Sequence, residues 1–374
     1  MTDSPRESPE GRHPVLVYRD RIGVPSEIEF LRRQYLGFRS LRPVWIGRAV
    51  LPAAARVSPS VIRIGGPRRL LFRHFGIAPP LNYSGFVPVV HAQFARGGAL
   101  ALPLANAMNA RLVVTLHGGD IAKDKNWRHT MLARRWPDVI ARTYRFVCVS
   151  GAVAETAIRR GVPEHLLTVL PIGVEVASSP PTAHREPVFL FAGRFVEKKG
   201  ITVLADAMRR LRAGGDTTKL ICAGDGPLRS VLEALTRDVP NVELVGWLSQ
   251  PALAALMETA LALVVPSVVA VDGDAEGLPS VVAEAMARGC AVVGSDEGGI
   301  AEAVIDGKTG LLVLPGDAGS LAAAMHRLSA EPGLAPRLAQ AAFGVAGERL
   351  NAIRQSASLE TILLEAAGIL THTL

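Results

Sequence analysis

Two glutamates, Glu276 and Glu284, are separated by seven residues in a segment that reads as loop, helix and strand. The turn former Gly277 precedes Pro279, which suits a first helical position because it has no N–H to leave unsatisfied. A helix N-terminus favours phosphate through its free N–H groups and its dipole. A carboxylate beside such a site repels phosphate, so we expect these two to accept hydrogen bonds from sugar hydroxyls. The alternative is a surface helix with two solvated glutamates.

Two basic residues, Arg194 and Lys199, stand five positions apart where a predicted strand at 188–192 turns toward a helix. Both side chains can reach one diphosphate, the arginine through its planar fork and the lysine as a point charge. Lys198 is an adjacent competitor, although the spacing favours Lys199. The alternative is a basic turn on the surface.

Polar residues also follow other predicted strands. His117 comes after the apolar run 112–116 and before two glycines. Because ligands bind at the carboxyl ends of strands in open α/β sheets, this histidine is a candidate site residue, although a lone histidine is more often structural. Asp120 either belongs to the same site or caps the next helix. Gly246 and Trp247 end another strand, where Trp247 either lines a pocket for a nucleotide base or packs in the core.

Short apolar runs alternate with helical stretches along the chain, which is typical of parallel α/β sheets. With 374 residues, two doubly wound, Rossmann-like domains are the natural expectation. We predict a disordered tail at 1–13, a first domain at 14–175, a Pro/Ser linker at 176–187, a second domain at 188–350 and a last helix within 351–374 that packs back on the first domain. The predicted strands are 14–18, 44–46, 57–64, 87–91, 112–116, 145–150, 188–192, 219–223, 242–245, 262–265, 290–293 and 311–314.

The cysteines and the apolar runs bear on the compartment. Cys148, Cys222 and Cys290 are widely spaced, lie in or beside apolar runs and form no C-x-x-C, so we expect reduced core residues of a cytoplasmic protein. Residues 1–13 lack the apolar core of a signal peptide. No uninterrupted apolar run reaches the roughly 18 residues of a transmembrane helix, so none is expected.

The charge is unevenly distributed along the chain. Residues 1–175 contain 25 Lys/Arg and 12 Asp/Glu, a balance of +13, whereas residues 176–374 contain 16 and 22, a balance of −6. This asymmetry indicates an anionic partner for the first half, such as an anionic lipid or a lipid diphosphate, or arginines that merely solvate the surface. We find no signature of a nucleic-acid-binding fold. The basic, aromatic segment 68–75 is either an amphipathic helix or a membrane-facing patch, so a peripheral membrane contact is one expectation.

Three motifs carry a family resemblance. DGDAEGLPSVVAEAMARGCAVV, at 272–293, resembles the donor-site motif of retaining glycosyltransferases of family 4, which have the GT-B fold, and especially the exopolysaccharide, colanic-acid-type branch. HGGD, at 117–120, is similar to the T-x-H-G-x-D of that branch, and GRFVEKKG, at 193–200, to its Gly-Arg…Lys-Gly phosphate element. The resemblance covers about residues 87–320; the usual Asn-Gly-Val-Asp exit is replaced by a sequence ending in Glu175, and only Ser26-Glu27 remains of a Ser-Glu-Thr-Phe-like element.

The resemblance implies an enzyme with a cleft between its domains. It would transfer a sugar, with retention, from a nucleotide diphosphate sugar such as a UDP- or GDP-sugar to a glycan or lipid-linked acceptor. No cofactor or metal is expected: Asp272 and Asp274 formally match a D-x-D metal element, but we interpret them as loop. Two alternatives are an epimerase of the same fold and a non-catalytic sugar-nucleotide-binding subunit. The implied catalytic residues are His117, Arg194, Lys199 and Glu276, and the implied donor-binding residues are Arg194, Lys199, Gly277, Leu278, Glu284, Gly246 and Trp247.

Overall fold

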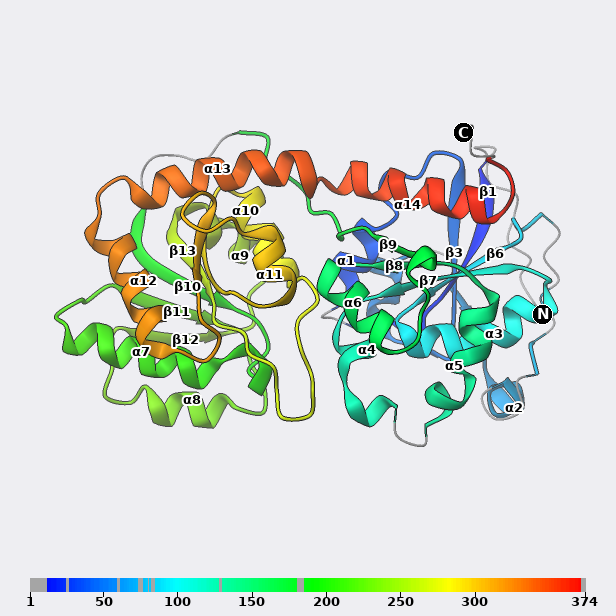
Figure 1. The fold of residues 1–374 in the computed structure, drawn as a ribbon, viewed down its shortest axis with the longest axis horizontal. Helices are drawn as coiled ribbons and strands as arrows, with labels where there is room; N and C mark the ends of the chain where they lie inside the picture. Colours follow the sequence, from blue (N-terminus) through cyan, green and yellow to red (C-terminus); the bar gives the residue numbers. More distant parts are fainter. Residues whose placement is uncertain are drawn as a thin grey trace.

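The chain forms two β-sheets of parallel strands, each covered by helices. The two sheets lie side by side along the long axis of the molecule (Figure 1). The structure is a computed structural model and describes residues 12–24, 27–58, 61–72, 77–79, 81, 85–127, 130–179 and 185–370. The expected two-domain α/β architecture is confirmed.

The first sheet has seven parallel strands in the order β5-β3-β1-β6-β7-β8-β9. Its central strands are apolar and buried on both faces, as in sheets covered on both sides. The strands are β1 (His13–Tyr18), β3 (Leu41–Gly47), β5 (Val61–Arg63), β6 (Val89–Gln93), β7 (Arg111–Leu116), β8 (Thr143–Cys148) and β9 (Leu167–Val169); β2 (Arg21–Ile22) and β4 (Ala49–Val50) pair separately. The helices are α1 (Ile28–Arg33), α2 (Gly66–Leu70), α3 (Ala95–Ala107), α4 (Gly119–Ala122), α5 (Met131–Arg142) and α6 (Gly151–Arg159).

The second sheet has six parallel strands in the order β12-β11-β10-β13-β14-β15. They are β10 (Glu186–Ala192), β11 (Lys219–Ala223), β12 (Val242–Gly246), β13 (Ala260–Val265), β14 (Ala291–Ser295) and β15 (Gly310–Val313). The helices are α7 (Ile201–Ala213), α8 (Arg229–Leu235), α9 (Gln250–Thr259), α10 (Ser280–Ala287), α11 (Gly298–Ala303), α12 (Ala318–Ala330) and α13 (Leu334–Arg349). In both sheets the strand order reverses next to the first strand, which creates the crevice where open α/β sheets bind ligands.

The chain crosses between the domains at two adjacent places. Val174 N donates to the Leu350 carbonyl at 2.7 Å, and Ala352 N donates to the Val174 carbonyl at 2.9 Å. Gly173 allows this approach, because a Cβ at this position would lie 2.4 Å from the Cα of Ala352. After the crossing, α14 (Ala352–Ala366) continues from α13 along the edge of the molecule and packs on the first domain (Figure 1).

The last helix is anchored to the first domain by apolar and polar contacts. Leu359 and Leu363 are buried in a cluster with residues of the first sheet. The Glu360 carboxylate accepts hydrogen bonds from the N–H groups of three consecutive residues, Arg39, Ser40 and Leu41, at 2.7–3.0 Å. The second domain is bound in turn through Glu302 of α11, which accepts from two N–H groups at the N-terminus of α6.

Some elements differ from the sequence-based prediction. The strand expected over 57–64 is confined to Val61–Arg63, because Val57 N closes a 3₁₀ turn onto Ala54. The short strand β9 was not predicted. Pro279 stands at the N-cap of α10 and not inside it. Ser26, residues 73–75 of the 68–75 segment and residues 180–184 of the linker lie outside the described residues.

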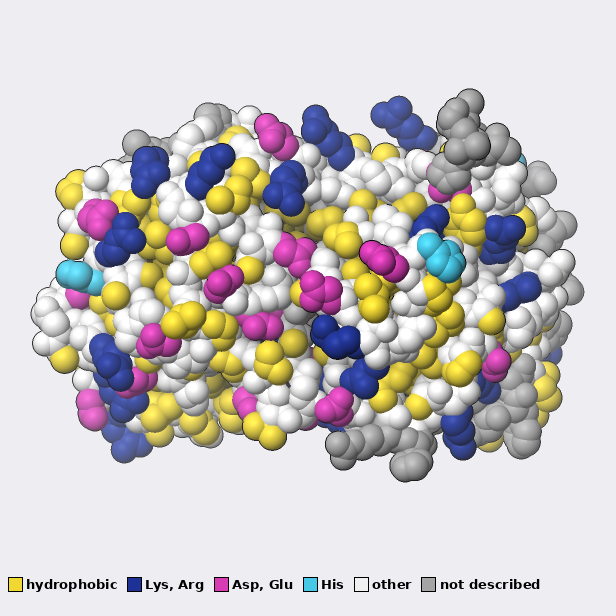
Figure 2. All heavy atoms as spheres, in the orientation of Figure 1, with side chains coloured by type: hydrophobic (Ala, Val, Ile, Leu, Met, Phe, Trp, Pro, Cys, Tyr) yellow, Lys and Arg dark blue, Asp and Glu magenta, His cyan; other side chains and the backbone are white. Residues whose placement is uncertain are grey.

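The surface reflects the charge imbalance of the sequence. On the face drawn in Figure 2, acidic side chains are more frequent over the second domain than over the first. The three cysteines are buried as free thiols. In the described ranges, no helix combines the length and the apolar character needed to cross a bilayer.

Candidate functional site

A cavity of about 540 Å³ lies between the domains, at the carboxyl ends of strands from both sheets. The first domain contributes Phe30 of α1, Phe94 and His117. The second domain contributes the turn after β10 and the segment that leads into α10, whose first residue, Ser280, lines the wall. The other lining residues are Glu27, Gly119, Asp120, Lys123, Lys125, Asn126, Val149, Ile172, Lys198, Lys199, Asp274, Glu276, Leu278, Pro279 and Ala283.

Glu276 is the central acidic group of this cavity. Its Oε1 lies 3.0 Å from the Lys199 Nζ and 3.7 Å from the Lys198 Nζ, and its side chain is only 9% exposed. Burial by itself raises the pKa of Glu276, but the two lysines outweigh it and hold the pKa below its usual value. The lysine contacts are ion pairs without hydrogen-bond geometry, so this buried Oε1 has no hydrogen-bond partner in the described structure. A buried acceptor of this kind is suited to a ligand hydroxyl.

The loop that precedes Glu276 is held by lysines. Asp274 binds Lys123 of the first domain at 2.7 Å and Lys198 at 3.2 Å, and Asp272 binds Lys125 at 2.9 Å. The two carboxylates therefore act as cross-domain contacts. Among the described residues, no group of three or more His, Cys, Asp or Glu side chains is arranged to hold a metal ion.

His117 lies in an aromatic corner of the cavity. Its ring centroid is 4.3 Å from that of Phe94 and 5.3 Å from that of Phe30. Phe94 adopts φ +70°, a strained conformation for a bulky residue, and the Arg19 guanidinium lies 4.1 Å over its ring. Burial, with Arg19 and His91 adding to it, lowers the pKa of His117 to about 3, so the imidazole is neutral at physiological pH.

Hydrogen-bond accounting fixes which nitrogen of His117 carries the proton. The Gln93 amide nitrogen donates to Gln34 Oε1 at 2.7 Å and to the Tyr35 hydroxyl at 2.8 Å. The Gln93 oxygen therefore faces His117 Nε2, at 2.8 Å, and can only accept. His117 consequently carries its proton on Nε2, which leaves Nδ1 as an acceptor.

The hydrogen-bond network extends from Gln93 into the first domain through Tyr35 and His91. Because the Tyr35 hydroxyl accepts from Gln93, it donates to His91 Nδ1, which is 2.8 Å away. His91 then donates from Nε2 to the Thr115 hydroxyl at 2.7 Å. All of these side chains are buried, so the network holds Gln93 and His117 in one orientation.

Asp120 ties two turns of the cavity together. Its carboxylate accepts from Ala95 N, at the start of α3, at 2.7 Å and from His117 N at 2.9 Å. Burial raises the pKa of Asp120 in spite of these bonds. Asp120 lies inside α4 and supports the backbone of His117 from there. It therefore does not act as the N-cap of the next helix, which was the other sequence-based alternative.

Two glycines allow the domains to touch beside the cavity. A Cβ on Gly277 would lie 2.4 Å from the His117 carbonyl oxygen, and a Cβ on Gly118, where φ is +116°, would lie 2.5 Å from the Gly277 nitrogen. No other residue fits either position without moving one domain. The Gly277 carbonyl accepts from Gly299 N at 2.8 Å, which joins this contact to α11.

Glu284 does not line the cavity. It is buried in α10 and binds Arg33 of α1, with the Arg33 Nη1 2.5 Å from its Oε1. Both side chains are less than 10% exposed, and the Arg33 Nε has no partner in the described part of the chain. Beside it, Arg32 binds Glu175, which stands where the chain leaves the first domain, at 2.7 Å. Glu284 therefore joins the donor-side helix directly to the first domain.

The structure places some of the predicted site residues in the cavity and others outside it. Lys199, Glu276, Leu278 and His117 line it, and Gly277 borders it. Arg194 is exposed at the turn after β10 and is not among the lining residues. Gly246 ends β12, and Trp247 is 62% exposed, so this tryptophan is not a core residue.

Several site residues were not found from the sequence. Phe30, Phe94 and Gln93 have no motif of their own, and Arg33 is 251 residues away from its partner Glu284. Gln93 lies two residues after the predicted strand 87–91, so its position at a strand end was the one available signal.

We expect the free energy of unfolding to fall when the pH is lowered from 7 to 5. His91 and His117 have pKa values lowered by burial to about 3, against 6.5 for an unperturbed histidine. Between these values the unfolded chain binds protons that the folded chain excludes, so stability decreases as pH falls, by about 2 kcal/mol for each histidine at pH 5. Urea unfolding at the two pH values measures the change.

Two variants serve as controls for this pH dependence. His117→Gln removes one of the two imidazoles whose pKa is lowered, while its amide can still donate to Gln93, so it should roughly halve the loss of stability. His165→Asn, at an exposed position, should leave the loss unchanged. An equal pH dependence in His117→Gln and wild type would contradict the assignment.

Both halves of the chain match known protein families. Residues 13–178 match Glycosyltransferase Family 4, and residues 186–331 match Glycosyl transferases group 1. The amylovoran biosynthesis glycosyltransferase AmsK of Erwinia amylovora is 31% identical over 247 residues, 63% of this chain and 60% of AmsK. The putative colanic acid biosynthesis glycosyltransferase WcaL of Escherichia coli K12 is 29% identical over 66% of this chain and 61% of WcaL. The chain thus spans about 60% of the length of these relatives.

Solved structures support the fold. HepE of Anabaena, determined in complex with UDP and glucose, has a TM-score of 0.75 at 17% identity, covering 94% of this chain and 99% of HepE. Sucrose-phosphate synthase of Thermosynechococcus elongatus has a TM-score of 0.74 at 22% identity, covering 95% of this chain and 99% of that protein. With its two matched domains and this architecture, the chain belongs to the family 4, group 1 glycosyltransferases of GT-B fold.

Proposed function

We propose that the chain transfers a sugar from a nucleotide diphosphate sugar to a glycan or lipid-linked acceptor in exopolysaccharide synthesis, with retention of configuration. The observation that carries this proposal is the buried Glu276 Oε1, which has no hydrogen-bond partner in the described structure and lies beside Lys199 in the interdomain cavity. In a nucleotide sugar, a hydroxyl of the sugar lies near a phosphate. The Glu276 carboxylate would accept a hydrogen bond from the hydroxyl, and the neighbouring Lys199 would bind the phosphate. The relatives named for amylovoran and colanic acid synthesis support the polysaccharide context.

The proposed mechanism relies on charge stabilisation. As the glycosidic bond breaks, negative charge grows on the β-phosphate oxygen. Lys199 and Lys198, together with the first N–H groups of α10, are arranged to stabilise that charge, and the exposed Arg194 lies on the same turn. Because these groups are already held in place, they need little reorganisation during the reaction. We assign no carboxylate as a nucleophile.

The sugar would be oriented by groups on both walls. On the second-domain side, Glu276 would accept a hydrogen bond from one sugar hydroxyl. On the first-domain side, the neutral His117 would accept a hydrogen bond from another through Nδ1. Both acceptors are held in fixed positions, so their hydrogen bonds with the hydroxyls would select the geometry of the donor sugar.

An epimerase that acts on the nucleotide sugar is not favoured, because the relatives reported above are named as transferases. A thermal-shift panel of nucleotides and nucleotide sugars identifies the donor, since only a ligand of the native state raises its stability. Product analysis with and without acceptor then tests the proposal. A new nucleotide sugar formed without acceptor, or a chain stabilised by no nucleotide sugar, would contradict it.

We expect transfer to persist in excess EDTA. The carboxylates of Asp272 and Asp274 already bind lysines, and lysine side chains with helix N–H groups would neutralise the leaving diphosphate in place of a cation. Initial rates measured with EDTA, and with added Mn²⁺ or Mg²⁺ after chelation, check this. Abolition by EDTA and recovery with either cation would reassign the loop as a metal site.

A further inference from the structure

A clamped arginine lies directly behind the wall of the interdomain cavity. Arg19 follows β1, and its guanidinium donates two hydrogen bonds to the Glu27 carboxylate, from Nε at 2.9 Å and from Nη2 at 2.6 Å. Such a bidentate pair fixes the guanidinium in one orientation. Glu27 lines the cavity, whereas Arg19 is not among the lining residues. Arg19 is therefore placed to act on the site through its neighbours and not by touching a ligand.

The ring that Arg19 covers is Phe94, which does line the cavity. The Arg19 Cζ lies 4.1 Å from the Phe94 ring centroid, so the charge is held against the π face. The same ring packs on His117, with 4.3 Å between the ring centroids and 38° between the planes. Phe30, three residues after Glu27, also contacts the imidazole, at 5.3 Å between the centroids. Glu27, Arg19, Phe94 and His117 thus form one continuous series of contacts.

Phe94 keeps its place in this series with a strained backbone. Its φ of +70° lies in a region that bulky residues avoid. Its N–H donates to the Thr115 carbonyl at 2.8 Å, and its own carbonyl accepts from Gly98 N at 3.0 Å, so the backbone is tied to β7 and α3. A conformation of this kind persists only where the surrounding groups hold it, and it is found most often at functional sites. The Arg19 guanidinium is one of the groups that hold the Phe94 ring.

His117 depends on this support for its orientation. Within the described structure, its ring makes one hydrogen bond, from Nε2 to Gln93 at 2.8 Å. One hydrogen bond fixes one edge of the imidazole, and a flat neighbour is needed to fix its plane. Phe94 is that neighbour, so the direction of the His117 Nδ1 depends on Phe94 and, through it, on Arg19. Burial and, after it, the Arg19 charge lower the pKa of His117, which favours the neutral ring.

We propose that Arg19 is a positioning residue for the donor sugar: it holds Phe94 against His117, so that the His117 Nδ1 faces a sugar hydroxyl. The proposal rests on the proposed transfer function and gives a role to the Ser26-Glu27 remnant of the sequence motif, since Glu27 holds Arg19 in place.

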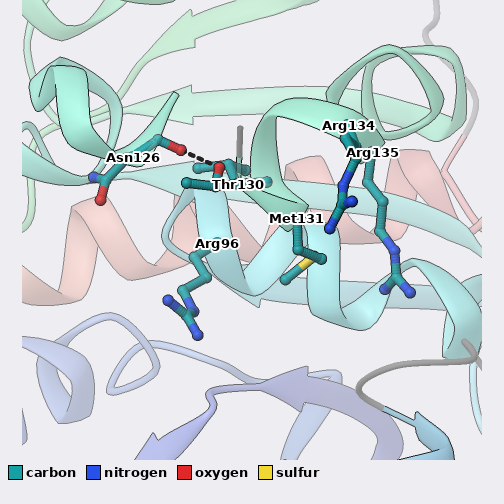
Figure 3. A pocket seen from close by; sticks show the side chains of 7 residues that line it. Arg96, Asn126, Thr130, Met131, Arg134 and Arg135 are labelled. Carbon is teal, nitrogen blue, oxygen red and sulfur yellow. Dashed lines mark hydrogen bonds between the residues drawn. The ribbon is translucent and has the colours of Figure 1, made fainter. Parts of the chain in front are cut away.

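Other arginines of the first domain lie elsewhere. Figure 3 shows Arg134 and Arg135 extending from α5, with Arg96 coming from α3, around a separate cavity. None of the three is stacked on Phe94 or on another ring that contacts His117 in the described structure. Arg134 is exposed, so it is a suitable control position.

Calorimetry separates recognition of the sugar from recognition of the nucleotide. The probes are UDP-glucose with UDP and GDP-mannose with GDP, and the pair that binds the chain is used. We expect Arg19→Ala to weaken binding of the nucleotide sugar at least fivefold and to leave binding of the nucleotide diphosphate within twofold. Arg134→Ala should change neither. Equal losses for both ligands in Arg19→Ala, or the same loss of nucleotide sugar in Arg134→Ala, would overturn the proposal. If Arg19→Ala does not fold, Arg19→Gln, which can keep one hydrogen bond to Glu27, is measured in its place with the same expectation.

A double-mutant cycle tests whether Arg19 acts through His117. In His117→Ala the acceptor that Arg19 positions is already absent, so adding Arg19→Ala should weaken the nucleotide sugar by less than a further twofold. Glu27→Ala should reproduce the loss seen in Arg19→Ala. Losses that add up in Arg19→Ala/His117→Ala would show that Arg19 acts independently of His117 and would refute the proposal, as would full affinity in Glu27→Ala.

Nitrogen-15 NMR of labelled histidine tests the same proposal without a ligand. The His117 signals are identified by their loss in His117→Ala, and they report which ring nitrogen carries the proton. We expect His117 of the wild type to be protonated on Nε2 alone, and His117 of Arg19→Ala to populate both tautomers. Identical His117 signals in the two proteins would contradict the positioning role. Failure of every nucleotide sugar to bind the wild type would contradict the proposed transfer function alone, because the NMR measurement does not depend on binding.

Discussion

Lys199→Ala should lower kcat by about 10²–10³-fold, a larger effect than its effect on donor affinity. The charge that Lys199 meets grows in the transition state, so its loss is felt mainly in turnover. The position of its Nζ, 3.0 Å from Glu276 in the wall of the interdomain cavity, makes it the best placed of the basic residues. Steady-state kinetics with full donor titration separates kcat from KM.

The neighbouring basic residues provide the comparison. Arg194→Ala is expected to lower kcat as well, if the exposed guanidinium turns toward the bound diphosphate. Lys198→Ala should have a smaller effect, because Lys198 is shared with Asp274. In Lys199→Ala, Glu276 also loses its counter-ion, so the double variant Lys199→Ala/Glu276→Gln is needed. Unchanged turnover in both Lys199→Ala and Arg194→Ala would contradict the proposal that these residues stabilise the leaving diphosphate.

Glu284→Gln should weaken nucleotide diphosphate binding and also destabilise the fold. The first effect follows from the sequence-based expectation that Glu284 is a donor-binding residue whose carboxylate accepts hydrogen bonds from sugar hydroxyls, those of the nucleotide ribose, each worth about 1.5–3 kcal/mol for a charged acceptor. In this structure the same carboxylate binds Arg33. The second follows from Arg33, because removing one partner of a buried ion pair costs about 3–5 kcal/mol. Calorimetric titration of the nucleotide and urea unfolding measure the two separately.

A compensating variant distinguishes these two origins. Arg33→Met/Glu284→Gln removes the buried pair as a whole, so it should recover much of the stability lost in Glu284→Gln. Its nucleotide affinity should stay low if the carboxylate contacts the ribose, and a 2′-deoxy nucleotide should then discriminate little between variant and wild type. Glu276→Gln, by contrast, should spare nucleotide binding and impair transfer. Full recovery of nucleotide affinity in the double variant would mean that Glu284 serves only the interdomain contact. The same conclusion would follow if Glu284→Gln left nucleotide affinity unchanged while Glu276→Gln lowered it.

The fold followed from the sequence because its signals are local. Apolar runs such as 112–116 and 262–265 predict buried parallel strands wherever they stand, and β7 and β13 occur there. Motif residues at strand ends, such as His117 and Lys199, were placed in the cavity by the same rule. Tertiary context shortened β5, and the short strand β9 at the end of the first sheet was not predicted.

The rest of the site depends on contacts that no local pattern encodes. The spacing of Glu276 and Glu284 fixes their separation along the chain, but the packing of α10 decides that one lines the cavity and the other faces Arg33. Likewise, the five-residue spacing of Arg194 and Lys199 does not determine which side chain turns inward. Partners such as Arg33 lie in the other domain, where only the assembled structure brings them together.

The position of α14 has a consequence for synthesis on the ribosome. Its Leu359 and Leu363 complete a core whose other members include residues of β1 and β3, and its Glu360 binds three N–H groups at the start of β3. The first domain is therefore translated early but cannot bury this face until residues 352–366 emerge. During the intervening translation, an apolar face of the first sheet stays exposed and is a natural target for a chaperone that binds nascent chains.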